Sequence, residues 1–114
     1  MSQKMLGEFE HIVLLALLRL ETHAYGAAIR QLLQSEINRD VALGALYSTL
    51  ERMEKKGLVA SKLGESTAQR GGRPKRFFAV TAEGKAALRH AKQAIDNMWQ
   101  GIALKVGGEC HAQY

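Results

Sequence analysis

Hydrophobic spacing through the first half of the chain predicts three helices. Residues 8–20 are apolar on nearly every side, which predicts a helix buried at the centre of the core. The segments 25–37 and 41–56 each place their apolar residues on one face, as amphipathic helices do. Residues 38–40 separate these two helices and predict a turn, with Asp40 as the N-cap of the third helix.

The hydrophobic period then changes from helical to extended. Residues 58–63 and 75–80 are short strand-like runs, and the polar loop between them holds three glycines and the only proline. They predict a hairpin with a long tip. Thr81 is expected to cap a last helix over 82–106, whose apolar residues recur close to heptad spacing. These apolar residues are Leu88, Ile95, Met98, Trp99, Ile102 and Val106.

This order of elements predicts a mainly α (α+β) fold, a winged helix–turn–helix with a long C-terminal helix. The expected division is a DNA-binding unit over 1–81, a dimerisation helix over 82–106 and a flexible tail over 107–114. The helix over 41–56 has an apolar stripe, and its opposite face carries small, polar and basic side chains. A rod of this kind fits a major groove about 12 Å wide.

Composition narrows the class of protein. The 114 residues are 46% apolar and 24% charged, which predicts one globular domain. The longest apolar run, residues 12–18, is far shorter than the roughly 20 residues that span a bilayer, so we expect a cytoplasmic protein without a membrane partner. Cys110 is the only cysteine and cannot form an internal disulfide. The histidines show no metal-ligand spacing, and no motif supports an enzyme or a cofactor.

The positive charge is concentrated in the middle of the chain. Residues 39–76 hold nine basic and four acidic side chains, whereas 1–38 hold three and four and 77–114 hold four and three. The net charge of +5 is therefore located over the predicted third helix and hairpin. A gathered basic surface favours binding to a polyanion such as DNA. In the hairpin the basic residues are Arg70, Arg73, Lys75 and Arg76.

Four blocks of sequence together resemble the PadR family of bacterial transcriptional regulators. They are LGEFEHIVLLALL, AYG, VALGALYSTLERMEKKGLV and GGRPKRFFAVTAEGKAAL, which occur in the family's order and spacing from residue 6 to 88. The resemblance implies a homodimeric DNA-binding regulator, usually a repressor of a palindromic operator, often relieved by a small molecule. A single helix after the wing is similar to the short subgroup, in which that helix pairs with its twin.

Family roles transfer to the residues that match. Tyr47 corresponds to the tyrosine of the recognition helix and Arg52 to its basic residue, while the basic hairpin corresponds to the wing. Two positions depart from the pattern: Ala42 stands where Ser or Thr is common, and Ser48 where proline often follows the tyrosine. The expected DNA-binding residues are Gly44, Ala45, Tyr47, Ser48, Arg52, Arg70, Arg73, Lys75 and Arg76.

The last helix supports a second hypothesis. Trp99 is the only tryptophan, and it either anchors the dimer interface or flanks a site for a flat aromatic effector, together with Ile95, Met98 and Ile102. Two other interpretations of the chain stay open. One is a ligand-binding protein that senses aromatic compounds at the dimer interface, and the other is a winged-helix module for protein contacts alone.

Overall fold

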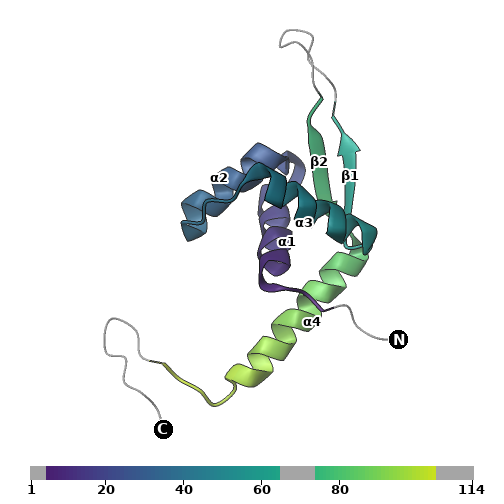
Figure 1. Ribbon diagram of the computed structural model, residues 1–114. Helices are drawn as coiled ribbons and strands as arrows, with labels where there is room; N and C mark the ends of the chain where they lie inside the picture. The colour runs from purple at the N-terminus through teal and green to yellow at the C-terminus, as the bar shows by residue number, and fades with distance from the viewer. Residues whose placement is uncertain (1–4, 65–73, 105–114) are drawn as a thin grey trace.

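The computed structural model describes residues 5–64 and 74–104. Three helices, α1 (Glu8–Leu20), α2 (Gly26–Ile37) and α3 (Leu43–Lys55), form the centre of the molecule, with a short 3-10 turn, η1 (Glu21–His23), between the first two. The strands β1 (Val59–Leu63) and β2 (Arg76–Val80) project from this group as a hairpin, and α4 (Ala82–Trp99) extends in the opposite direction (Figure 1). The winged helix–turn–helix prediction is confirmed.

The hairpin is antiparallel and is tied to the helices at its base. Val59 pairs with Val80, and Leu63 pairs with Arg76 at the outer end of the described ladder. Before α2, Tyr25 forms an isolated bridge with Phe77, and the Phe78 N–H donates to the Ala24 carbonyl at 2.9 Å. The segment before α2 therefore pairs with β2 as a very short third strand would, and this pairing holds the wing beside the helix–turn–helix.

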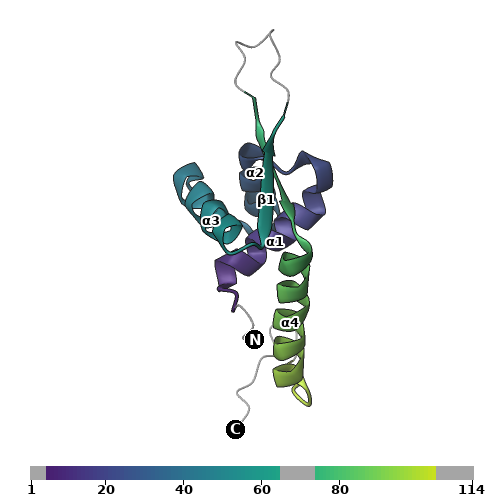
Figure 2. The same cartoon turned by 90° about the vertical axis from the view of Figure 1, so that its right-hand side faces the viewer.

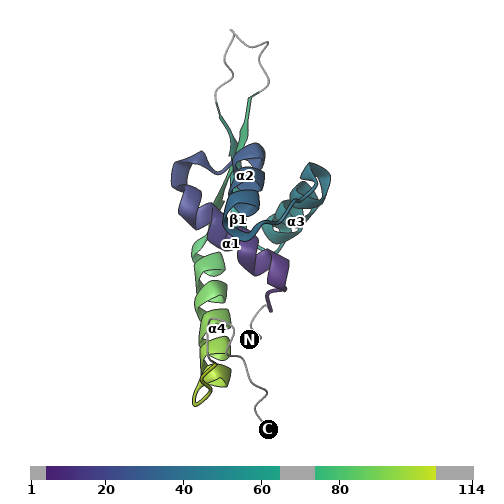
Figure 3. The ribbon, with the colours of Figure 1, turned by 90° about the vertical axis from the view of Figure 1, so that its left-hand side faces the viewer.

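The core lies where α1, α2, α3 and β2 meet. Leu14, Ile29, Leu46 and Leu50 are fully enclosed, and Phe78 reaches the same cluster from β2. Figure 2 shows α3 on one side of the hairpin with α1 crossing behind its base, and Figure 3, from the opposite side, shows α1 and α2 in front of the strands. The stripe on α3 that the sequence predicts is confirmed as its buried face, except that Leu43 is 40% exposed.

The prediction that the first helix is buried at the centre of the core holds for only one side of α1. Val13, Leu14 and Leu17 are buried, but Leu15 and Leu18 on the other side of the helix are 45% and 41% exposed. The core residues of the other elements pack against only the buried side of α1. An apolar strip of α1 is therefore left uncovered in the protomer.

Two helix ends differ from the predictions. Ala42 is the N-cap of α3 and makes no side-chain capping bond, whereas Asp40, the expected cap, lies with a carboxylate oxygen 3.7 Å from the Arg30 guanidinium. The last helix does not run over 82–106, since it ends at Trp99. Gly101 adopts a φ of +78°, and the Ile102 N–H donates to the Trp99 carbonyl at 2.9 Å, which turns the chain out of the helix.

Thr81 caps α4 as the sequence predicts. Its hydroxyl oxygen accepts from the Gly84 N–H at 3.0 Å and donates to the Gly57 carbonyl at 2.6 Å. A Cβ at Gly84 would overlap the Leu58 carbonyl oxygen, so only glycine allows the first turn of α4 to approach the end of α3 so closely. This junction positions α4 relative to the winged unit.

Candidate nucleic-acid interface

The outer face of α3 is made of small, exposed side chains. Gly44, Ala45 and Ser48 are all exposed on the side away from the core. Apart from its own helix backbone and its two chain neighbours, a Cβ built at Gly44 would meet no heavy atom of residues 5–64 and 74–104 within 4 Å. Glycine inside a helix costs about 0.5–1 kcal/mol relative to alanine, and no packing within the protomer requires it at this position. The helix therefore presents a surface that another molecule can approach closely.

Tyr47 stands at the edge of that face, half-buried. Its ring lies 6.0 Å from the Phe78 ring, and its hydroxyl oxygen is so close to Gly26 that a Cβ there would stand 2.6 Å from it. Gly26 is the first residue of α2, so the tyrosine fixes how closely α2 and α3 approach each other. The packing and the DNA-contact interpretations of Tyr47 are compatible, because the ring packs while its hydroxyl lies at the start of α2.

Arg52 is paired with an acid that the sequence did not single out as its partner. Glu10 of α1 is buried, and its Oε2 accepts from Arg52 Nε at 3.4 Å and from Lys56 Nζ at 3.1 Å. The other oxygen, Oε1, accepts from the Gly7 N–H at 3.0 Å. The Arg52 side chain nevertheless remains 54% exposed. This cluster attaches the last turns of α3 to the start of α1.

Glu10 is ionised in this setting. Burial opposes the charged form, but the hydrogen bonds from Gly7, Lys56 and Arg52 outweigh it and hold the pKa of Glu10 below its ordinary value. Two basic side chains of the candidate DNA-binding helix thus have a fixed anionic partner inside the protein. No sequence pattern revealed this, because Glu10 and Arg52 are far apart in the chain and meet only through the packing of α1 against α3.

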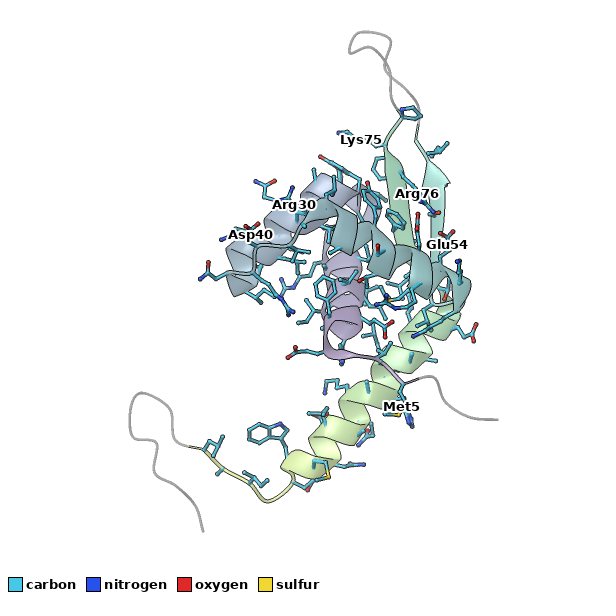
Figure 4. All side chains as sticks on the ribbon, in the orientation of Figure 1. Met5, Arg30, Asp40, Glu54, Lys75 and Arg76 are labelled. Carbon is cyan, nitrogen blue, oxygen red and sulfur yellow. The ribbon has the colours of Figure 1, made fainter. Side chains whose placement is uncertain are left out.

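The basic wing divides into two parts. Arg70 and Arg73 lie outside the described residues. Lys75 is exposed, with Nζ 4.1 Å from the centroid of the Tyr25 ring, whereas Arg76 turns toward α3 and ends 2.8 Å from Glu54 (Figure 4). Lys75 directly precedes β2 and its carbonyl still pairs with the Gly64 N–H, so the backbone is extended there and neighbouring side chains point to opposite faces. The two cations are adjacent in the sequence, but they lie on different sides of the wing.

The end of α4 exposes most of its apolar residues. Ile95, Met98 and Trp99 are 55%, 75% and 49% exposed, and Ile102 beyond the helix is 56% exposed. The buried residues of α4 are Gly84, Ala87 and Leu88, all in its first half. The predicted dimer or effector residues are therefore exposed on the second half of α4 and just beyond it.

Other kinds of site find little support in the described parts of the chain. Within residues 5–64 and 74–104, no three His, Cys, Asp or Glu side chains gather so as to hold a metal ion. In the same ranges, no helix has the length and apolar character that crossing a membrane requires. Cys110 and His111 lie outside them.

Comparison with known proteins gives consistent results for fold and family. A crystallised PadR-like transcription factor from Bacteroides fragilis superposes with a TM-score of 0.66 at 27% identity, over 79% of this chain and 82% of that one. A PadR family regulator from Clostridium difficile gives a TM-score of 0.58 at 30% identity, over 80% and 94%. A PadR family regulator from Eggerthella lenta gives 0.64 at 26%, over 83% and 82%. Among curated proteins, none matches this sequence.

The family model described as the transcriptional regulator PadR-like family matches residues 14–90. The match runs from α1 through the wing to the middle of α4, and it includes both the exposed face of α3 and Arg76. The chain therefore belongs to the PadR-like family of transcriptional regulators, and it is a DNA-binding regulator of transcription.

Proposed function

We propose that this protein is a homodimeric, sequence-specific repressor that binds a palindromic operator and is released by a small aromatic effector. The observation that carries the DNA-binding part is Gly44, an exposed helical glycine with open space where its side chain would be. Together with Ala45 and Ser48 it forms a surface on which α3 can enter a major groove and bring its helix backbone close to the bases.

The DNA-binding surface includes residues beside that face. The Tyr47 hydroxyl and the exposed Arg52 flank it on α3, and Lys75 extends it onto the wing. Arg70 and Arg73, which lie outside the described residues, complete the proposed set as phosphate contacts of the wing. Ser48 is the proposed reader of sequence, because a hydroxyl can reach either a base edge or a phosphate.

The dimer is supported by the uncovered apolar surface of the protomer. Ile95, Met98 and Trp99 follow one another along the exposed end of α4, and Leu15 and Leu18 form a second exposed strip on α1. Side chains of this size are normally withdrawn from water, so a second copy of the chain is the proposed cover. Two-fold symmetry then requires operator half-sites about one helical turn, roughly 34–36 Å, apart.

Effector binding is the part of the proposal that concerns Trp99. Its ring is 49% exposed, which leaves an aromatic face available to a flat apolar compound between two copies of α4. Because Trp99 is the only tryptophan, its fluorescence reports directly on that position. Titration with a diverse set of aromatic compounds should find quenchers that also release DNA. If no compound quenches, the effector part of the proposal is wrong.

The DNA-binding part is tested by selecting a duplex from a random library and measuring affinity by fluorescence anisotropy across a salt series. We expect a palindromic selected sequence and an affinity that falls steeply with salt, with a log–log slope of about −0.9 for each phosphate neutralised. Sedimentation in the same buffers should give a dimer. A complex that is insensitive to salt, or a selection that yields no common sequence, would contradict the proposal.

A further inference from the structure

A polar network joins the wing to the last turn of α3. Arg76 of β2 donates from Nη2 to Glu54 Oε1 at 2.8 Å and from Nε to Ser61 Oγ at 3.2 Å. Ser61 of β1 in turn donates to the second oxygen of Glu54 at 2.8 Å. The three side chains therefore form a closed ring of hydrogen bonds that spans both strands and the helix. Figure 4 shows Arg76 and Glu54 facing each other across this junction.

One edge of the Arg76 guanidinium, formed by Nε and Nη2, is engaged inside the protein. The third nitrogen, Nη1, lies 3.6 Å from Glu51, and the central carbon stands 5.1 Å from the centroid of the Phe78 ring. The side chain is 33% exposed, and that of Glu54 is 34% exposed. A bidentate contact with a DNA phosphate needs two N–H groups on one edge of the guanidinium. The Nε–Nη2 edge of Arg76 could make such a contact only by giving up Ser61 and Glu54. The Nη1–Nη2 edge could do so only beside the Glu51 carboxylate, which repels a phosphate.

The network also lies where it sets the angle between the wing and α3. Arg76 pairs with Leu63 at the outer end of the described ladder, and Glu54 is next to the last residue of α3. A shift between strand and helix at this point changes the angle between the wing and the exposed face of α3. Both must reach one duplex at the same time, so this angle decides whether the two contacts are compatible.

We propose that Arg76 is a positioning residue, which holds the wing at a fixed angle to α3 through Glu54 and Ser61 and does not itself contact phosphate. This proposal rests on the DNA-binding surface proposed above. It makes an acid, Glu54, necessary for binding a polyanion. Charge alone predicts that removing Glu54 strengthens DNA binding, whereas the positioning role predicts that it weakens binding. This difference makes the proposal testable.

The test compares Glu54→Gln, Arg76→Gln and the double variant against the selected duplex by anisotropy. Glu54→Gln removes a negative charge beside DNA, so charge alone predicts equal or tighter binding. The positioning role predicts about tenfold weaker binding, a similar loss for Arg76→Gln, and a double variant no weaker than the weaker single one. The matched control is Glu51→Gln, which removes the same charge one turn earlier at a longer contact and should stay within about twofold.

The salt dependence separates positioning from phosphate contact. If Arg76 touches no phosphate, Arg76→Gln keeps the log–log slope of the wild type, whereas loss of one phosphate contact reduces the slope by about 0.9. Thermal melting of each variant checks that the fold is retained. A reduced slope for Arg76→Gln, tighter binding by Glu54→Gln, or losses that multiply in the double variant would each overturn the proposal.

A measurement without DNA distinguishes failure of this role from failure of the proposed function. In the free protein, the Arg76 Nε proton should exchange slowly with solvent, and Glu54→Gln should accelerate it. Fast exchange in the wild type would show that the network does not form and would overturn the proposal directly. Slow exchange in a protein that binds no duplex would instead refute DNA binding, and the positioning role with it.

Discussion

Replacing Gly44 by alanine adds one methyl group to the exposed face of α3 and separates two explanations of that glycine. The residue occupies the second position of the helix, and beyond that helix's own backbone a Cβ there meets nothing within 4 Å in the described part of the chain. Alanine is the better helix former by about 0.5–1 kcal/mol. We therefore expect Gly44→Ala to raise the free energy of unfolding by that amount.

DNA binding should change in the opposite direction. If the backbone of α3 lies close to base edges, the added methyl group occupies space that the duplex needs. Loss of a well-fitted contact in such an interface costs about 1–3 kcal/mol, so we expect affinity for the selected duplex to fall about tenfold or more. Urea denaturation measures the first quantity and fluorescence anisotropy the second, on the same preparation.

The matched control is Gly84→Ala, since a Cβ there would overlap the Leu58 carbonyl oxygen. That variant should lose about 1–3 kcal/mol of stability because the junction before α4 must shift. A Gly44→Ala protein that is more stable and binds DNA as well as the wild type would refute the close approach. A destabilised one would show that the glycine serves the fold.

Three further changes test other parts of the account. Glu10→Gln should cost about 1–3 kcal/mol at pH 7, because it weakens hydrogen bonds that a buried carboxylate accepts. Folding lowers the pKa of Glu10, so the carboxylate's contribution to stability is fully present above the unfolded pKa of about 4.3. This contribution is lost as the pH falls through the folded pKa. The urea midpoints of the wild type and Glu10→Gln should therefore converge in acid. Ala42→Ser places a hydroxyl at the uncapped start of α3 and should add about 0.5–2 kcal/mol by the same assay; no gain would show that this end is already satisfied. Trp99→Ala should weaken dimerisation about tenfold or more in sedimentation equilibrium, as loss of a large interface aromatic does, whereas unchanged association would place the interface elsewhere.

Local sequence patterns predicted most of the fold. The change from helical to extended spacing after Gly57, and the Thr81 cap, are decided by residues close together in the chain, and the structure confirms both. The predicted end of α4 was wrong because the heptad spacing continues past Trp99, while the chain leaves helical geometry at Gln100 and turns through Gly101. Apolar spacing shows where a helix can be buried, but it does not show where a turn ends it.

Contacts between distant elements could not be predicted in the same way. Glu10 and Glu54 are ordinary acids in the sequence, and only packing places them beside Arg52 and Arg76. Counting charge located the basic region without showing which cations already have partners. The extended backbone at the start of β2 then turns Lys75 toward Tyr25 and Arg76 toward Glu54, although the two are adjacent in the chain.

Nuclear magnetic resonance titration of the labelled protein with the selected duplex is the sharpest test that the exposed face of α3 and the wing bind duplex DNA. We expect the largest amide shift changes on Gly44, Ala45 and Ser48, with a second group around Lys75. Saturable binding that leaves these amides unchanged and shifts residues of α4 instead would contradict it.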